Sequence, residues 1–192
     1  MLKNIFALIF LYGFIVSNCK GNQPVLDKFP EIGGNFTLED TAGNKFSLSD
    51  LKGKSVLLFF GYTNCPDACS FNLSRLSAVY KKLGSDSEKV KTLFVTVDPA
   101  RDTKEKMGKY LSYFKFNPIG LIGTGKEIDK VADLYKIVHI KRETGKGTDY
   151  QVDHSTITFL IDANGVVRYL IKQDDPVNQV TAVIRNLLSE KL

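Results

Sequence analysis

The chain has 192 residues, of which 43% are hydrophobic and 24% charged, with a formal net charge of +5. These values are typical of a globular protein with one domain. The basic residues are scattered, with short clusters only at 104–109 and 141–146. They form no sustained basic stripe, so we expect no nucleic-acid partner.

The first residues are expected to form an export signal and to lie outside the folded domain. After a basic start, the apolar run 5–16 is too short for the ~20 residues of a spanning helix, but it fits the apolar region of a secretory signal. Val16-Ser17-Asn18-Cys19 resembles a bacterial lipoprotein signal, although Asn18 stands where a small residue is usual. We therefore expect a signal peptide at 1–18 and lipidation of Cys19. An ordinarily cleaved signal and an uncleaved anchor are the alternatives.

Residues 19–31 are polar and contain two prolines, which is typical of a tether. The chain from 32 to 192 is expected to form the domain. With a lipid on Cys19, the protein would be exported and anchored to the cell membrane, with this domain on the periplasmic or outer side. The domain opens with a predicted β-hairpin, formed by alternating residues 35–38 and 45–48 around turn residues 40–44.

The organising stretch of the domain is Val56–Cys69. Its apolar run Val56–Phe60 predicts a strand buried on both faces. After the break at 61–64, a helix is expected to open at Cys65, with Pro66 in its first position and Gly84 at its end. Two thiols therefore lie where a buried strand passes into a helix.

The later elements follow from hydrophobic periodicity and turn residues. Asp102 or Thr103 is expected to cap the second helix, and the sequence Asp162-Ala163-Asn164-Gly165 predicts a hairpin turn. The expected elements are a strand at 90–97, a helix through 107–114, a short strand or loop at 119–123, a helix at 126–135, a strand-like run at 137–140, a polar loop at 141–149, hairpin strands at 155–161 and 166–171, and a last helix after 176.

This order of elements predicts an α/β fold with a mixed central sheet flanked by helices. A strand–helix–strand–helix unit is followed by a hairpin and a helix, and a cysteine pair follows the first buried strand. This order of elements is typical of a thioredoxin-like fold.

With Cys19 in the leader, Cys65 and Cys69 form a self-contained pair. A helix N-terminus lowers thiol pKa and favours the thiolate. A structural disulfide would close only a tiny loop and stabilise little. A redox pair that exchanges with other disulfides and a site for a soft metal such as Cu(I) or zinc both remain open.

The two histidines bear on that choice. His139 alternates with apolar residues and is interpreted as a packed or surface side chain. His154 lies in a predicted loop entering a hairpin strand, and in a thioredoxin-like sheet this loop faces the cysteine turn. His154 is therefore expected to complete a two-thiolate, one-imidazole site. Asp153 is interpreted as an outer group of the site, a strand-edge residue or a cap.

Three ordered segments carry a family resemblance: 60–69, read as Phe-Gly-Tyr-Thr-Asn-Cys-Pro-Asp-Ala-Cys, then 97–103 and 152–155. They resemble the hallmark segments of the Sco/SenC family of copper-binding proteins. The resemblance implies a thioredoxin-like fold on a membrane tether and copper, as Cu(I) or Cu(II), bound by Cys65, Cys69 and His154. It also implies a role in building the Cu(A) centre of cytochrome c oxidase. The partner would be the copper-bearing oxidase subunit or another copper chaperone.

Three functions are weighed against each other. The first is a copper metallochaperone, a binding protein without turnover. The second is a thiol-disulfide oxidoreductase that reduces the cysteines of the oxidase or of other exported proteins, with Cys65–Cys69 as its disulfide when oxidised. The third is a peroxiredoxin-like peroxidase. The x3 spacing of the cysteines and the absence of proline from 151–158 favour metal binding over exchange.

Overall fold

The computed structural model describes residues 25–145 and 150–190. The predicted signal peptide and Cys19 lie outside the described residues. Within the described ranges, no helix combines the length and the apolar character that a membrane span requires.

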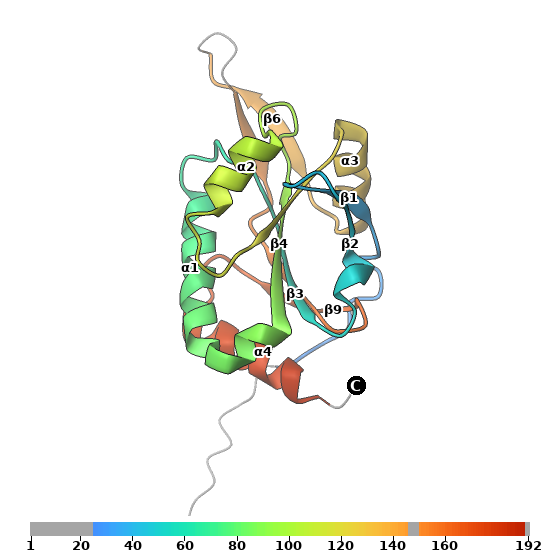
Figure 1. The fold of residues 1–192 in the computed structure, drawn as a ribbon, viewed down its shortest axis with the longest axis vertical. Coiled ribbons are helices and arrows are strands. Elements are labelled where there is room, and N and C mark those ends of the chain that lie inside the picture. Colours follow the sequence, from blue (N-terminus) through green and yellow to red (C-terminus); the bar gives the residue numbers. More distant parts are fainter. Residues whose placement is uncertain (1–24, 146–149, 191–192) are drawn as a thin grey trace, which may run out of the picture.

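A seven-stranded sheet forms the centre of the domain (Figure 1). Its order is β2-β1-β5-β4-β3-β8-β9; β3 pairs parallel with β4 and β4 with β5, whereas the other neighbours are antiparallel. The predicted mixed sheet and N-terminal hairpin are confirmed. The strands are β1 Thr37–Asp40, β2 Lys45–Ser47, β3 Ser55–Gly61, β4 Val90–Thr96, β5 Ile119–Ile122, β8 Thr158–Ile161 and β9 Val167–Ile171.

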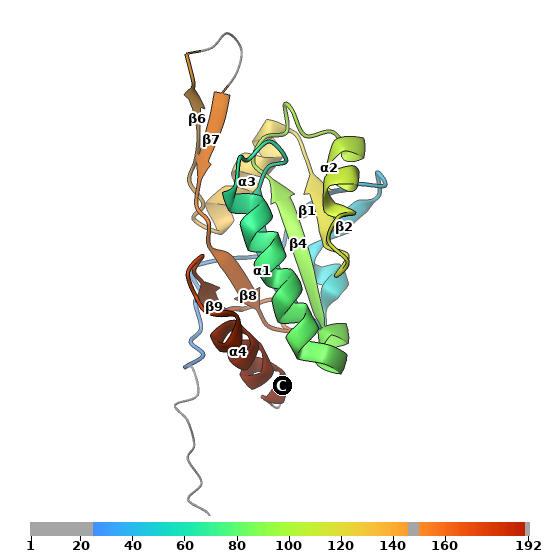
Figure 2. The same cartoon turned by 90° about the vertical axis from the view of Figure 1, so that its left-hand side faces the viewer.

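Helices cover both faces of this sheet (Figures 1 and 2). Helices α1 and α4 bury a shared apolar cluster against β3, β8 and β9, and α2 packs on β5 on the same face, where Met107 and Leu111 contact Gly120. Helix α3 covers the opposite face. The helices are α1 Ala68–Leu83, α2 Lys104–Leu111, α3 Gly125–Leu134 and α4 Val177–Ser189, with 3-10 turns at Leu48–Leu51 and Gly84–Lys89.

The sheet is buried because its central strands are apolar on both faces. All seven residues of β3 are buried, and β4 exposes only Lys91. This burial is the largest source of stability in the domain, since apolar area removed from water stabilises by about 25 cal/mol per Å². The core therefore fixes the position of the end of β3, where the cysteine turn begins.

Two expected boundaries are wrong. Helix α1 begins at Ala68, with Asp67 as its N-cap residue, so Pro66 precedes the helix and Cys65 lies in the turn before it. The stretch expected to be a loop at 141–149 begins with the end of strand β6, His139–Glu143, and the segment expected to be a loop before the last hairpin is strand β7, Tyr150–His154. His154 is consequently the last residue of a strand and not a loop residue.

Strands β6 and β7 form a separate two-stranded sheet that projects from one end of the domain (Figure 2). Four of the five residues of β6 are exposed, so the strand has no buried face. Alternation between apolar and polar residues, the usual sign of a strand, is therefore weak in this sequence. Hydrogen-bonded pairing with β7 decides its conformation.

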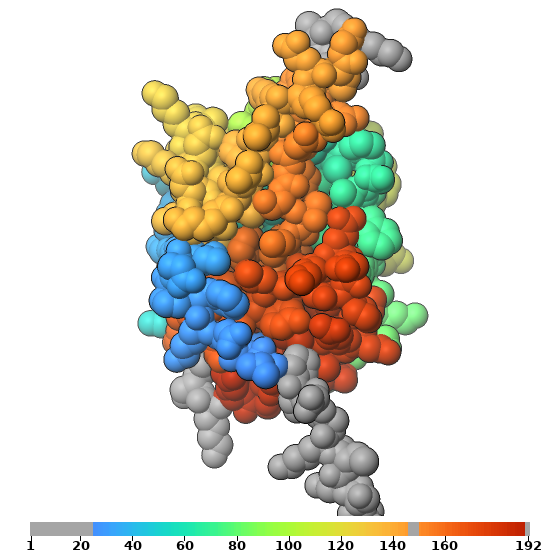
Figure 3. Space-filling view, turned by 180° about the vertical axis from the view of Figure 1, so that it is seen from behind, coloured from blue at the N-terminus to red at the C-terminus, as the bar shows by residue number. Residues whose placement is uncertain are grey.

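The first described residues run along the edge strand β9. The Asp27 N–H donates to the Arg168 carbonyl at 3.2 Å, and the Phe29 N–H donates to the Val167 carbonyl at 3.1 Å. The buried Arg168 guanidinium in turn donates to the Asp27 carbonyl at 2.8 Å. Figure 3 shows this N-terminal segment in blue beside the C-terminal part of the chain, at the end of the domain away from the β6–β7 hairpin.

Candidate metal centre

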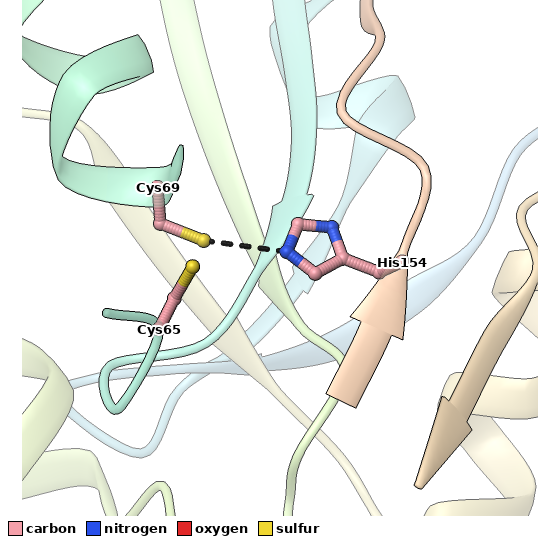
Figure 4. A group of neighbouring side chains, drawn as sticks. All are labelled: Cys65, Cys69 and His154. Atoms are coloured by element: carbon pink, nitrogen blue, oxygen red, sulfur yellow. Dashed lines mark hydrogen bonds between the residues drawn. The ribbon is translucent and has the colours of Figure 1, made fainter. Parts of the chain in front are cut away.

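Three side chains from three segments meet at the end of β3. Cys65 lies in the turn after β3, Cys69 is the second residue of α1, and His154 ends β7. Their sulfur and ring-nitrogen atoms all lie within 4.8 Å of one another (Figure 4). Both cysteines are free thiols. The structure thus brings together all three ligands predicted from the sequence.

The turn before α1 favours a thiolate at Cys65. A hydrogen bond from Cys69 lowers the pKa of Cys65 to about 4, with further help from the N–H groups of Cys69 and Asp67. Those N–H groups belong to the helix N-terminus, whose unpaired donors attract anions. Cys65 is half-buried, so its sulfur is also accessible from outside.

Cys69 has the opposite environment. Its hydrogen bond to Cys65 and its burial both raise the pKa of Cys69. In the metal-free state the pair therefore carries one shared proton, held by Cys69, and one thiolate, at Cys65. A soft metal ion would replace this proton, since only thiolates bind metals.

His154 presents a lone pair to the sulfurs. Its Nδ1 lies 3.0 Å from the Ser155 carbonyl. A carbonyl only accepts, so Nδ1 must carry the proton and Nε2 is left as an acceptor. Nε2 faces Cys69 Sγ at 3.5 Å. A backbone carbonyl behind the ring is the arrangement commonly found at metal-binding histidines, where it fixes the ring orientation.

Aromatic side chains hold the His154 ring in place. Tyr62 contacts it edge-on, with ring centroids 5.7 Å apart, and Phe59 does so at 6.2 Å. The Tyr62 hydroxyl also accepts the Val152 N–H at 3.2 Å, which ties β7 to the cysteine turn. The imidazole is therefore positioned before any metal arrives.

The buried carboxylate of Asp102 anchors the cysteine turn through hydrogen bonds. Asp102 is 2% exposed and accepts hydrogen bonds from the Thr63 N–H, at 3.1 Å, and the Thr63 hydroxyl. The Thr96 hydroxyl donates to the same carboxylate at 2.7 Å. Thr103, and not Asp102, caps α2 by accepting the Lys106 N–H. Asp102 thus stabilises the turn that carries Cys65 and does not cap α2.

A second buried carboxylate ties down the other ligand segment. Asp98 is completely buried, accepts from Arg101 and accepts the Tyr150 hydroxyl at 2.6 Å. Arg101 donates to the Tyr150 carbonyl at 2.8 Å and stacks on the Tyr150 ring at 3.6 Å. Tyr150 begins the strand that ends at His154. The segment 98–102 therefore braces both the cysteine turn and the histidine strand.

The structure separates the remaining candidates from the site. His139 pairs with His154 in the β6–β7 register, but its Nε2 contacts Asp129 at 3.3 Å. Asp153 is exposed and pairs with Arg142 at 2.9 Å. Its interpretation as a strand-edge residue is confirmed, and it makes no contact of its own with the sulfurs.

Sequence reasoning missed three contributors to the site: Gly61, Asp98 and Asp102. A methyl group at Gly61 would lie 2.8 Å from Cys69 Sγ, so this position must lack a side chain. The two aspartates lie in a loop rich in polar residues, where burial is not expected. Two signals were available: a glycine that ends an apolar run, which permits close approach, and the place of both aspartates in the hallmark segment 97–103.

A family model described as SCO1/SenC matches residues 26–189. The chain belongs to the SCO1/SenC family. An "SCO2-like protein" of Rickettsia felis is 39% identical over 147 residues, which are 76% of this chain and 71% of the relative. The stated resemblance is thereby confirmed.

Solved structures of family members share the fold. ScoI of Bradyrhizobium japonicum with copper bound is 38% identical, with a TM-score of 0.75 over 81% of this chain and 99% of that one. Yeast Sco1 with copper bound is 32% identical, with a TM-score of 0.77 over 85% and 91% of the two chains. The predicted thioredoxin-like architecture is confirmed by these neighbours.

The residues of this family member fit copper. Two thiolates suit Cu(I), and an imidazole with a free Nε2 lone pair suits Cu(II) as well. The three donor atoms already lie close together, two of them on half-buried side chains. Hard cations are disfavoured, because the cluster itself offers no oxygen ligand.

Proposed function

We propose that this protein is a copper metallochaperone that binds copper through Cys65, Cys69 and His154. The observation that carries the proposal is the preassembled group of two sulfurs and one imidazole nitrogen, all within 4.8 Å. Copper is here a cargo and not a resident cofactor. The family resemblance implies that its destination is the Cu(A) centre of cytochrome c oxidase, through the copper-bearing subunit or another copper chaperone.

The chemistry of the site suits transfer. Cys69 is fully buried, whereas Cys65 and His154 are half-buried. Three protein ligands leave a coordination position open, which a ligand of the acceptor can occupy before any bond to this protein breaks. Loading displaces the proton of Cys69, and release returns it. Metal exchange therefore passes through a mixed complex and not through free copper.

A second function is favoured by one observation, the lowered pKa of Cys65, to about 4. As an oxidoreductase, the Cys65 thiolate would attack a disulfide of the oxidase or of another exported protein, and one sulfur of that disulfide would leave as a thiolate. Cys69 would then lose its proton and resolve the mixed disulfide. The target gains two electrons, and the protein ends with a Cys65–Cys69 disulfide, which no longer binds copper.

The test of the copper site is an anaerobic titration of the reduced full-length chain with Cu(I) against a chromogenic chelator. We expect tight one-to-one binding that weakens in each of Cys65→Ser, Cys69→Ser and His154→Ala. His139→Ala is the matched control, since His139 contacts Asp129 instead of the sulfurs. Unaltered affinity in His154→Ala would show that the three-ligand site is wrong.

A transfer assay separates the two functions. His154 is needed to hold copper, but disulfide exchange uses only the two sulfurs. With an oxidised Cu(A)-site fragment as target, His154→Ala should retain reduction and lose copper delivery. If wild type reduces the fragment but never delivers copper, the chaperone function is wrong and the oxidoreductase function holds.

We further propose that the protein is exported and anchored to the cell membrane through a lipid on Cys19, with the domain on the periplasmic or outer side. The support is the sequence of the leader and the tether, together with the position of the first described segment, drawn in blue, at the end of the domain away from the β6–β7 hairpin (Figure 2). Membrane fractionation of wild type and Cys19→Ser tests this proposal: recovery of Cys19→Ser with the membranes to the same extent as wild type contradicts it.

A further inference from the structure

Tyr110 has a buried hydroxyl group without a partner. Its oxygen is shielded from solvent and forms no hydrogen bond with any residue of the described ranges 25–145 and 150–190. The hydroxyl groups of the other buried or half-buried tyrosines all contact a polar atom: Tyr62, Tyr80, Tyr135, Tyr150 and Tyr169. An unsatisfied buried hydroxyl costs about 1–3 kcal/mol, so its presence requires an explanation.

The Tyr110 side chain lies against the metal centre. It projects from α2, and its ring packs on Phe94 with centroids 6.0 Å apart. Phe94 and Cys69 Sγ meet at one point beside Gly61: a methyl group there would lie 2.9 Å from the Phe94 ring and 2.8 Å from the sulfur. Tyr110 and the deepest ligand, Cys69, therefore both lie beside the Phe94 ring.

The ionisable groups that act on this hydroxyl are all acidic. Burial raises the pKa of Tyr110, and the neighbouring Cys69, Cys65 and Asp102 raise it further, in that order. Tyr110 therefore remains a neutral phenol, which can donate one hydrogen bond. Of these three groups, Asp102 already accepts hydrogen bonds from Thr63 and Thr96, which leaves the two cysteine sulfurs as acceptors. Copper binding turns both cysteines into thiolates, which are better acceptors than thiols.

We propose that Tyr110 is a positioning residue of the copper centre, whose hydroxyl donates a hydrogen bond to the metal-bound thiolate of Cys69, directly or through one buried water. This inference rests on the proposed copper site and adds a residue that lies outside the three-ligand group. A hydrogen bond to a ligand sulfur draws charge from it and tunes the potential of the metal. It stabilises Cu(I) more than Cu(II), since the sulfur carries more charge in the Cu(I) state.

The test compares Tyr110→Phe with Tyr80→Phe in the full-length chain. Tyr110→Phe removes only the unpaired hydroxyl, so the free energy of unfolding of the metal-free protein should be unchanged or higher. Its Cu(I) affinity should fall about tenfold, the usual lower limit for loss of an outer partner of a metal ligand. With unchanged Cu(II) affinity, this loss corresponds to a potential lower by about 59 mV. The sulfur-to-Cu(II) charge-transfer band should move to longer wavelength.

Tyr80→Phe gives the opposite pattern. The Tyr80 hydroxyl lies 3.0 Å from Thr92 Oγ1, and its ring stacks on Phe116, within the α1–α4 cluster. Its loss should lower stability and leave copper affinity, potential and spectrum as in wild type. If Tyr110→Phe keeps the affinity and the charge-transfer band of wild type, the proposed role of Tyr110 is wrong while the copper site stands. If wild type itself fails to bind Cu(I), the site and this inference fall together.

Discussion

Replacement of Gly61 by alanine tests how closely the core approaches the metal ligands. Gly61 ends β3, and a methyl group there would lie 2.8 Å from Cys69 Sγ and 2.9 Å from Cε2 and Cζ of Phe94. Favourable contacts between heavy atoms of this kind lie near 3.5–4.0 Å. To reach that range the Cys69 sulfur has to move by about 0.7–1.2 Å, and the Phe94 ring, which lies in the same tightly packed core, has to shift as well.

Such a displacement is larger than a metal site tolerates. Ligand distances in working sites hold within about 0.2 Å. We expect Gly61→Ala to lower Cu(I) affinity at least about tenfold, or about 1.4 kcal/mol. Overpacking costs a further 1–3 kcal/mol or so of folding free energy. For a chain of this length, that cost corresponds to a melting temperature lower by about 2–12 °C.

Two other glycines separate the loss of copper from the loss of stability. A methyl at Gly123 would lie 2.7 Å from Leu38 Cδ2, in a different part of the core, so Gly123→Ala should lower the melting temperature without weakening copper binding. Gly125→Ala should leave copper binding unchanged and should not lower the melting temperature, because nothing lies within 4 Å of its added methyl. Chelator competition and thermal unfolding of the three variants check these results. Wild-type Cu(I) affinity in Gly61→Ala would refute the reasoning.

Two further predictions concern the cysteine turn. The pKa of Cys65 is lowered to about 4, so its thiolate should react with iodoacetamide well below pH 7 in the metal-free protein. Cys69, whose pKa is raised, should stay unmodified. Alkylation at pH 4–9, followed by digestion and mass spectrometry, measures both reactions. The lowered pKa also stabilises the folded state: this contribution is complete above about pH 8.5, the pKa of cysteine in the unfolded chain, and is lost as the pH falls toward 4. If Cys65 reacts with iodoacetamide only above pH 8, the prediction is wrong. Asp102→Asn leaves at least one hydroxyl or N–H donor of Thr63 or Thr96 without an acceptor, so urea unfolding should show a loss of about 1–3 kcal/mol. Weaker Cu(I) binding should accompany that loss, and a wild-type urea midpoint would rule out Asp102 as the anchor of the turn.

Hydrophobic pattern and turn chemistry by themselves determined most of the secondary structure. The short, continuous apolar run of β3 predicted a strand buried on both faces, and all of its residues are buried. Gly84 predicted the end of α1, where it adopts a positive φ of 59°. The β6–β7 hairpin escaped this reasoning because β6 is exposed along almost its whole length. Its conformation comes from pairing with β7, the next strand along the chain, and not from burial, which is what hydrophobic periodicity detects.

The three proposed ligands could also be predicted from the sequence, since residue type and motif order suffice to select Cys65, Cys69 and His154, which the structure brings together. Only the tertiary structure decided how they are held. Asp102 acts on Thr63, 39 residues earlier in the chain, and Gly61 lets the Cys69 sulfur of the following helix approach β3; both contacts exist only after β3, β4 and α1 have packed. The opposite pKa directions of the two cysteines have the same origin, because burial and neighbouring donors, not residue type, set them.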